Sequence, residues 1–246
     1  MIYGLPLQTV DSFSVTLEIV IVLNPHRIAL YNYAHLPARF PPQRRINETA
    51  LPDPKTKLAI LQYSIDRLVQ ARYIYIGMDH FAKPNDKLKT AQNSGRLHRS
   101  FHGYSTHSEC NSVAMGVSAI SKIGDHYSQN TTDIMSYDDQ LSVSKLPKYR
   151  GHKTEPKDIF RRDIIQQLIC FCRLDISSLE RRWSIDFKNY FAHELKQLQR
   201  MQADKLLSIS NKEIQALENG RLLVRNICMV FDRFIGDNGG LHSCLV

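Results

Sequence analysis

Apolar residues recur at helical spacing in two segments of the first eighty residues. Residues 9–23 form the first segment, and either Thr9 or Asp11 can cap its N-terminus. Residues 54–71 form the second, which opens with a proline after an aspartate. The pattern predicts an α-helix over each. Within the first helix, residues 19–22 leave almost no polar face, which is unusual for a helix on the outside of a sheet or barrel.

Three shorter segments have the composition of β-strands. Residues 1–5, 26–34 and 73–78 are rich in aromatic and β-branched side chains and alternate with the two helices. The resulting βαβαβ order predicts parallel strands joined by crossover helices, in an α/β sheet or barrel. Ligands in such folds lie beyond the carboxyl ends of the strands, so residues 32–35 and 77–80 are candidate positions for a site.

The second half of the chain has a different pattern. From about residue 149 the predicted elements are mainly helical, and a short hairpin interrupts them. We therefore predict two domains: an α/β domain over 1–148 and a helical, winged-helix-like domain over 149–246. The elements expected after residue 85 are a short helix at 86–94, a strand or buried turn at 113–121, helices at 157–172, 176–191 and 193–203, a hairpin at 206–217 and a helix at 220–235.

Composition is that of a globular protein. The chain has 246 residues, 43% of them hydrophobic and 23% charged. No apolar stretch approaches the roughly 18 residues of a membrane span, and the first residues do not have the pattern of a secretory signal. We expect a cytoplasmic protein with no membrane partner.

Charge and cysteines leave several functions open. The formal net charge is +8, and much of the excess lies within 145–162, which we interpret as a solvated linker or helix start. Such a run also suits nucleic acid or an anionic small molecule. The five cysteines are too scattered for a disulfide framework, and Cys170 and Cys172 point to different faces of a predicted helix. No metal site is predicted.

Several sequence blocks stand out in order along the whole chain. They are Ile-Tyr-Gly-Leu-Pro at 2–6, Asn-Tyr-Ala-His-Leu-Pro at 32–37, Gly-Met-Asp-His-Phe-Ala at 77–82, Leu-His-Arg-Ser-Phe-His-Gly-Tyr-Ser-Thr at 97–106, Met-Gly-Val-Ser-Ala-Ile-Ser at 115–121, Phe-Cys-Arg-Leu-Asp at 171–175 and Gly-Arg-Leu-Leu-Val-Arg-Asn-Ile-Cys-Met at 220–229. Together these blocks resemble the C-terminal part of the oxygen-independent coproporphyrinogen III oxidases. A family of haem chaperones shares the barrel but has a different stretch where this chain has Gly-Met-Asp-His-Phe-Ala.

The resemblance implies a fold and a reaction. The fold is the C-terminal part of a partial (βα) radical-SAM barrel, followed by the helical domain. In the complete family enzyme a [4Fe–4S] cluster cleaves S-adenosyl-L-methionine (SAM). The resulting radical oxidatively decarboxylates two propionates of coproporphyrinogen III to vinyl groups, giving protoporphyrinogen IX in haem biosynthesis.

The chain departs from the family in its cysteines. The family holds its cluster with a Cys-x3-Cys-x2-Cys motif, and no such spacing occurs here. The early barrel strands are also missing, and Met1 corresponds to the middle of a family strand. We therefore expect a truncated barrel that is inactive alone, and a separately encoded N-terminal half as a potential partner.

Four residues match family positions at the cofactors or the substrate pocket. Ala34 corresponds to a contact to the second SAM, and Ile120 to an apolar contact to the cluster-bound SAM. Phe101 and His102 correspond to a pocket-lining pair, although the family usually has glutamine where His102 stands. No catalytic residue is assigned in this chain.

Two other functions compete with this interpretation. A winged-helix-like domain with a basic linker could bind DNA through residues 176–191, which carry Arg181, Arg182, Lys188 and Asn189 together with two acids. We expect no sequence-specific binding of nucleic acid. Porphyrin binding without catalysis is the third reading, and none of the ten histidines stands out as an axial ligand.

Overall fold

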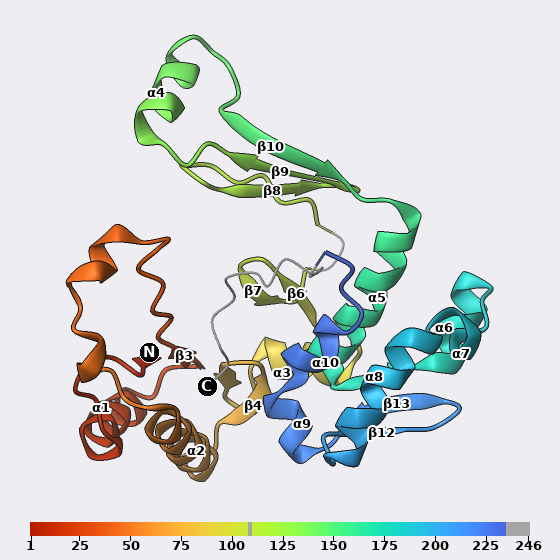
Figure 1. Ribbon diagram of the computed structural model, residues 1–246, viewed down its shortest axis with the longest axis horizontal. Helices are drawn as coiled ribbons and strands as arrows, with labels where there is room; N and C mark the ends of the chain where they lie inside the picture. Colours follow the sequence, from red (N-terminus) through yellow and green to blue (C-terminus); the bar gives the residue numbers. More distant parts are fainter. Residues whose placement is uncertain (108–109, 235–246) are drawn as a thin grey trace.

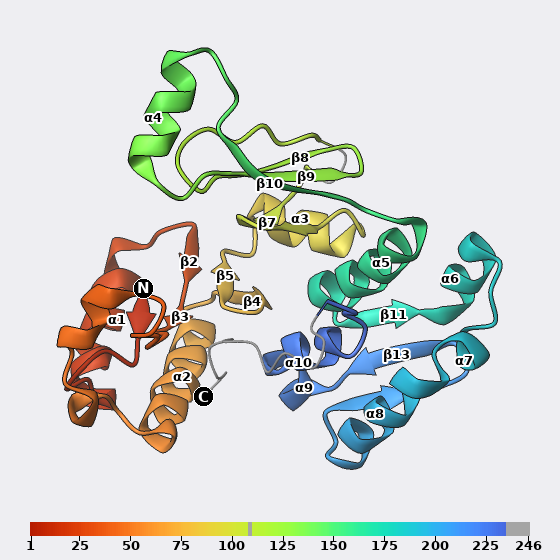
Figure 2. The same cartoon turned by 45° about the horizontal axis from the view of Figure 1, so that its top comes forward.

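The computed structural model describes residues 1–107 and 110–234 (Figure 1). An N-terminal α/β part, a projecting arm and a helical C-terminal part follow one another along the chain (Figures 1 and 2). The N-terminal elements are β1 (Ile2–Tyr3), α1 (Val10–Leu23), β2 (Arg27–Ala29), β3 (Tyr31–Asn32), the 3-10 helices Pro41–Arg45 and Glu48–Ala50, α2 (Pro54–Gln70), β4 (Ile74–Gly77), β5 (His80–Ala82), α3 (Lys87–Asn93), β6 (His98–Ser100) and β7 (Gly103–Ser105).

Strand pairing in the N-terminal part is only partly parallel, which corrects the sequence expectation. β1 and β3 pair in parallel around α1, but β5 lies between β2 and β4 and is antiparallel to both. The predicted strand 26–34 is two strands rather than one. Leu30 separates them, because its N–H donates to the carbonyl of Asp79 at 2.8 Å and the chain passes from one sheet to the other.

The two predicted helices of this part are confirmed, including their caps. The Thr9 and Asp53 side chains each accept a hydrogen bond from a backbone N–H of the first helical turn. α1 buries Phe13 and Leu17 against α2 and the strands. Its other face is apolar and uncovered in this structure, where Val15, Ile19, Val22 and Leu23 are between 58% and 82% exposed.

Residues 110–153 form an arm that projects from the body (Figure 1). The arm consists of β8 (Ile120–Ile123), β9 (His126–Asn130), α4 (Ile134–Ser142) and β10 (Lys148–Lys153), with the three strands in one antiparallel sheet. Among the arm's described residues, Pro147 is the only buried apolar residue. Its stability therefore rests on backbone hydrogen bonds and a few buried polar groups.

Two sequence expectations are wrong in the arm. Residues 113–121 are not a buried strand or turn, since Val113 is 73% and Met115 is 89% exposed and the strand begins only at Ile120. Within the basic run 145–162, β10 replaces the expected linker, whereas the expected helix start is confirmed, since a helix begins at Pro156. All six β10 residues are exposed, so the strand shows no alternation of apolar and polar positions.

The C-terminal part has its own hydrophobic core, centred on α5. The predicted hairpin is confirmed, and β11 joins it in a three-stranded sheet, as in a winged-helix arrangement. The elements are α5 (Pro156–Phe171), β11 (Arg173–Asp175), α6 (Ile176–Trp183), α7 (Phe187–Tyr190), α8 (Ala192–Ala203), β12 (Leu207–Ile209), β13 (Glu213–Ala216), α9 (Glu218–Leu222) and α10 (Val224–Met229).

Two predicted helices of this part are each divided. The helix expected at 176–191 breaks after α6 because Ser184 takes a left-handed conformation, with φ of 51°. The helix expected at 220–235 is the pair α9 and α10, and its last residue lies outside the described part of the chain.

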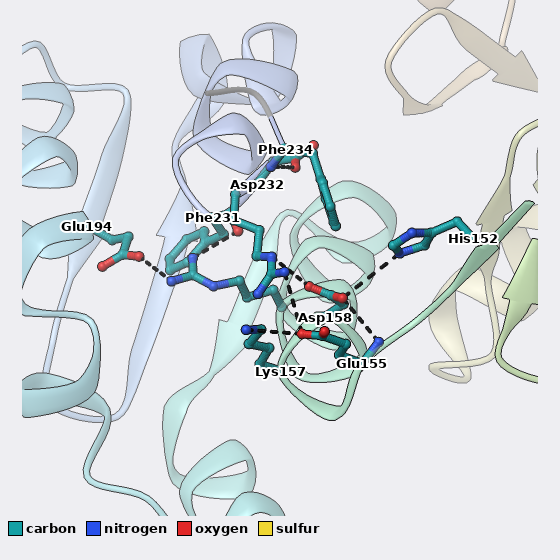
Figure 3. A network of polar contacts seen from close by, with 10 residues as sticks. His152, Glu155, Lys157, Asp158, Glu194, Phe231, Asp232 and Phe234 are labelled. Carbon is teal, nitrogen blue, oxygen red and sulfur yellow. Dashed lines mark hydrogen bonds and ion pairs between the residues drawn. The ribbon is translucent and has the colours of Figure 1, made fainter. Parts of the chain in front are cut away.

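A polar network fixes the start of α5 (Figure 3). Asp158, 6% exposed, lies 2.9 Å from Nε of Arg233 and accepts a hydrogen bond from the N–H of Glu155. Next to it, Arg161 pairs with Glu194 at 2.7 Å and donates to the carbonyl of Phe231. The network joins the end of the arm, α5 and the segment after α10.

The helices of the described residues are all too short or too polar to cross a membrane.

Candidate functional site

A cavity of about 470 Å³ lies between the β6–β7 hairpin, the first strands of the arm and α5. Volumes of a few hundred Å³ are typical of small-molecule sites. The three elements are far apart in sequence, so the cavity exists only because the arm folds back over the hairpin (Figure 2).

The hairpin presents Phe101 and His102 at its turn, on the cavity wall. Their rings meet edge to face, with centroids 5.8 Å apart. The Ser100 hydroxyl accepts from the N–H of His102 at 3.2 Å, which closes the turn. Gln166 of α5 holds the hairpin from behind, because its side-chain amide donates to and accepts from the backbone of Arg99. The pair is therefore held on a rigid support.

Of the four residues singled out from the sequence, three lie together. Ile120, at the start of β8, lines the same cavity as Phe101 and His102. Ala34 does not line it. Ala34 follows β3, and its carbonyl accepts a hydrogen bond from Gln43 at 3.1 Å. Whether these four residues contact cofactor or substrate stays a prediction.

The strand end at 77–80 carries an aspartate–histidine pair. Asp79 and His80 are 2.7 Å apart between Oδ1 and Nδ1, and both side chains are mostly buried. The rings of Tyr31 and Tyr104 pack edge-on against the imidazole. Burial, with a smaller contribution from the Asp79 carboxylate, raises the pKa of Tyr3 to about 12. The carboxylate thus belongs to a partly buried, polar and aromatic cluster beside the cavity.

The cysteines of the described residues do not fit an iron–sulfur cluster. Cluster ligands must be thiolates. Burial raises the pKa of Cys170 to about 12 and also raises the pKa of Cys172 and Cys228, so the three are protonated thiols at neutral pH. Cys110 is exposed, and the described residues include no group of three or more potential ligands that could hold a metal ion.

Sequence reasoning missed the charge of the cavity. Arg99, Lys122 and Arg162 line it, together with three histidines, and its described lining includes no carboxylate. The run at 145–162 indicated excess positive charge. Nothing in the sequence showed that one residue of that run meets cations from β6 and β8.

The fold is that of a mixed α/β protein with a helical C-terminal domain, and its cavity has the size of a small-molecule site. Residues 155–223 match the HemN C-terminal domain family. The coproporphyrinogen III oxidase (HemN) from Escherichia coli, whose structure is described as that of a radical SAM enzyme, superposes with a TM-score of 0.91 at 48% identity, over 95% of this chain and 54% of that chain.

The chain belongs to the oxygen-independent coproporphyrinogen III oxidase family. Enzymes of that name from Pseudomonas aeruginosa and Thermostichus vulcanus are 51% and 42% identical to it, over 96% and 98% of this chain. The match covers 51% of the first relative and 74% of the second. The chain therefore spans about half the length of most of the relatives it matches.

Proposed function

We propose that this chain provides the C-terminal part of an oxygen-independent coproporphyrinogen III oxidase and works only with a polypeptide equivalent to the other half of its relatives. The observation that supports this most directly is the extent of the match. The chain covers 51% of the length of the Pseudomonas aeruginosa enzyme and superposes on the Escherichia coli structure with a TM-score of 0.91. In this proposal the complete assembly converts coproporphyrinogen III to protoporphyrinogen IX. The chain alone is inactive, because its buried thiols are unsuited to hold the cluster.

The surfaces of the N-terminal part support a missing neighbour. β1 pairs with β3 alone among the described strands, so its other edge is unpaired. The apolar face of α1 is uncovered as well, with Ile19 58% and Val22 82% exposed. Unpaired edges and apolar faces are the features that a partner covers. The four cysteines of the described residues are free, which suits a cytosolic location, where thiols stay unpaired.

Co-production with the N-terminal half of the Pseudomonas aeruginosa enzyme tests the proposal. The two polypeptides should co-purify, and the reconstituted complex, given SAM and reductant anaerobically, should release carbon dioxide and form protoporphyrinogen IX. Either half alone should do neither. Product formation by this chain alone, or no association between the halves, would contradict the proposal.

The DNA-binding alternative loses its main support in the structure. Residues 176–191 do not form one recognition helix, and Arg182 is paired with Asp163 at 2.8 Å. Asn189 hydrogen-bonds to Asp186 of its own segment. We therefore keep the proposal that the chain binds no specific nucleic acid. A footprint on one DNA sequence at physiological salt would overturn that part.

A further inference from the structure

The described residues that line the cavity include cations and no carboxylate. Arg99 comes from β6, Lys122 from β8 and Arg162 from α5, and all three line the same space. In the part of the chain that the structure describes, none of the three side chains forms an ion pair with a carboxylate.

Two consecutive arginines of α5 show the contrast. Arg161 lies 2.7 Å from Glu194, whereas Arg162, which lines the cavity, pairs with no carboxylate of the described residues.

Lys122 and Arg162 are both neighbours of Tyr127. Lys122 and Tyr127 are directly opposite each other in the β8–β9 pairing, so their side chains are neighbours on one face of the sheet. Arg162 reaches the same tyrosine from α5 and donates a hydrogen bond to its hydroxyl at 3.2 Å. The two cationic residues are thus both neighbours of Tyr127, and an anion bound between them would offset their mutual repulsion.

Arg99 adds a third charge to the same cavity. Its guanidinium lies over the ring of Tyr104, 4.7 Å from the centroid, and its Nη1 is buried without a hydrogen-bond partner. A buried donor without a partner is costly, and a bound acceptor removes that cost. Guanidinium groups match the geometry of carboxylates, which two parallel N–H groups can bind together.

We propose that Lys122 and Arg162 together bind a carboxylate of an anionic ligand in this cavity, with Arg99 adding positive potential. The ligand class that we infer is a tetrapyrrole with carboxylate side chains. The identity of the ligand rests on the proposed function, whereas the anion preference rests on the cavity alone. Phe101 and Ile120 of the same cavity then offer apolar surface to the rest of the ligand.

Titration of the full chain with coproporphyrin III, the stable oxidised tetracarboxylate, tests the inference by porphyrin fluorescence. Its tetramethyl ester has the same ring without charge and serves as the ligand control. We expect coproporphyrin III to bind with an affinity that falls as salt rises, and the ester to bind at least about 10-fold more weakly, as expected for loss of charge-assisted hydrogen bonds.

Lys122→Gln and Arg162→Gln should each weaken coproporphyrin III binding by about 5- to 10-fold, and the double variant by more. The matched control is Lys196→Gln, which removes the same charge from an exposed site on α8 and should leave the affinity unchanged. Neither cavity side chain is fully buried, so the variants should keep the circular dichroism spectrum and melting temperature of the parent chain.

Three results would overturn the inference: no binding of coproporphyrin III, equal binding of the ester, or cavity variants that bind like the Lys196 control. Binding is measured without the other half and without SAM. Failure to reconstitute activity would therefore contradict the proposed function but not the anion site. Failure of the titration would contradict the anion site but not the proposed function.

Discussion

The hydroxyl of Tyr104 donates a hydrogen bond of 2.7 Å to the main-chain carbonyl oxygen of Ile169. This contact joins β7, the strand that supports the cavity, to α5, the central helix of the C-terminal part. The same ring packs against His80 and lies under Arg99. One side chain thus couples the N-terminal part, the cavity and the C-terminal core.

Replacing Tyr104 with phenylalanine should lower the free energy of unfolding by about 1–2 kcal/mol, because the Ile169 carbonyl loses its partner in a buried position. Urea denaturation followed by circular dichroism measures this. Tyr149→Phe is the control, since that side chain is 68% exposed and should give no change. Equal stability of the two variants would show that the contact contributes nothing.

Gly220→Ala should destabilise the C-terminal part by about 3 kcal/mol, the upper range for overpacking. A methyl group on this buried residue would overlap the main-chain carbonyl of Leu206, which cannot move aside because it also accepts a hydrogen bond from the N–H of Leu217 at 2.9 Å. Gly151→Ala is the control, because its nearest neighbour is at an ordinary contact distance of 3.4 Å. We expect the melting temperature of Gly220→Ala to fall below that of Gly151→Ala, and equal melting temperatures would contradict the prediction.

Stability should fall as the solution becomes alkaline. The pKa of Cys170 is raised from 9.0 to about 12 by burial, so the folded chain keeps this proton at a pH where the unfolded chain releases it. The contribution is therefore fully present below pH 9 and is lost as pH rises towards about 12. Tyr3, raised from 10.0 to about 12 by burial and by Asp79, acts in the same direction.

Each such group should lower the free energy of unfolding by about 1.4 kcal/mol per pH unit inside its window. Chemical denaturation at a series of pH values from 8 to 11 measures the slope. Cys170→Ala should flatten it, although that variant starts from a lower stability, whereas Cys110→Ser on the surface should not. A slope that Cys170→Ala leaves intact would rule out this origin.

The two faces of α1 should respond differently to substitution. Leu17 is fully buried, and its replacement by alanine should cost about 2–5 kcal/mol. Ile19 is 58% exposed, and Ile19→Glu should change stability by no more than about 0.5 kcal/mol while reducing self-association of the chain in light scattering. If Ile19→Glu unfolded the protein, the face would be part of the core rather than a surface for a partner.

Local signals allowed much of the helical structure to be predicted from the sequence. Thr9 and Asp53 carry the caps of α1 and α2, and Asp86 caps α3 in the same way. Such caps involve residues two or three positions apart, so a single sequence contains the whole interaction.

Strand order could not be obtained in this way. The insertion of β5 between β2 and β4 joins Arg27 to Ala82, which are 55 positions apart in sequence. β10 shows no alternation because none of its residues is buried. Pairing of this kind depends on the tertiary structure, and sequence periodicity does not report it.

Only some of the residues that line the cavity could be predicted from the sequence. Phe101, His102 and Ile120 came from their resemblance to family positions, and the fold places them on one wall. Arg162 belongs to the basic run at 145–162, but Lys122 is an isolated basic residue of a basic chain, and nothing in the sequence indicates that the fold brings the two together. The domain boundary between residues 148 and 149 stays a prediction.

An arm whose described residues bury only one apolar side chain, that of Pro147, has a consequence for how its sequence can change. Core residues are restricted in volume and shape, so a substitution there is usually costly. In the described arm, backbone pairing carries the structure, and backbone pairing accepts most side chains. We therefore expect residues away from the cavity, such as Lys148 and Lys153, to diverge among relatives faster than the flanking cores. Lys122 and Ile120 should change more slowly than their neighbours.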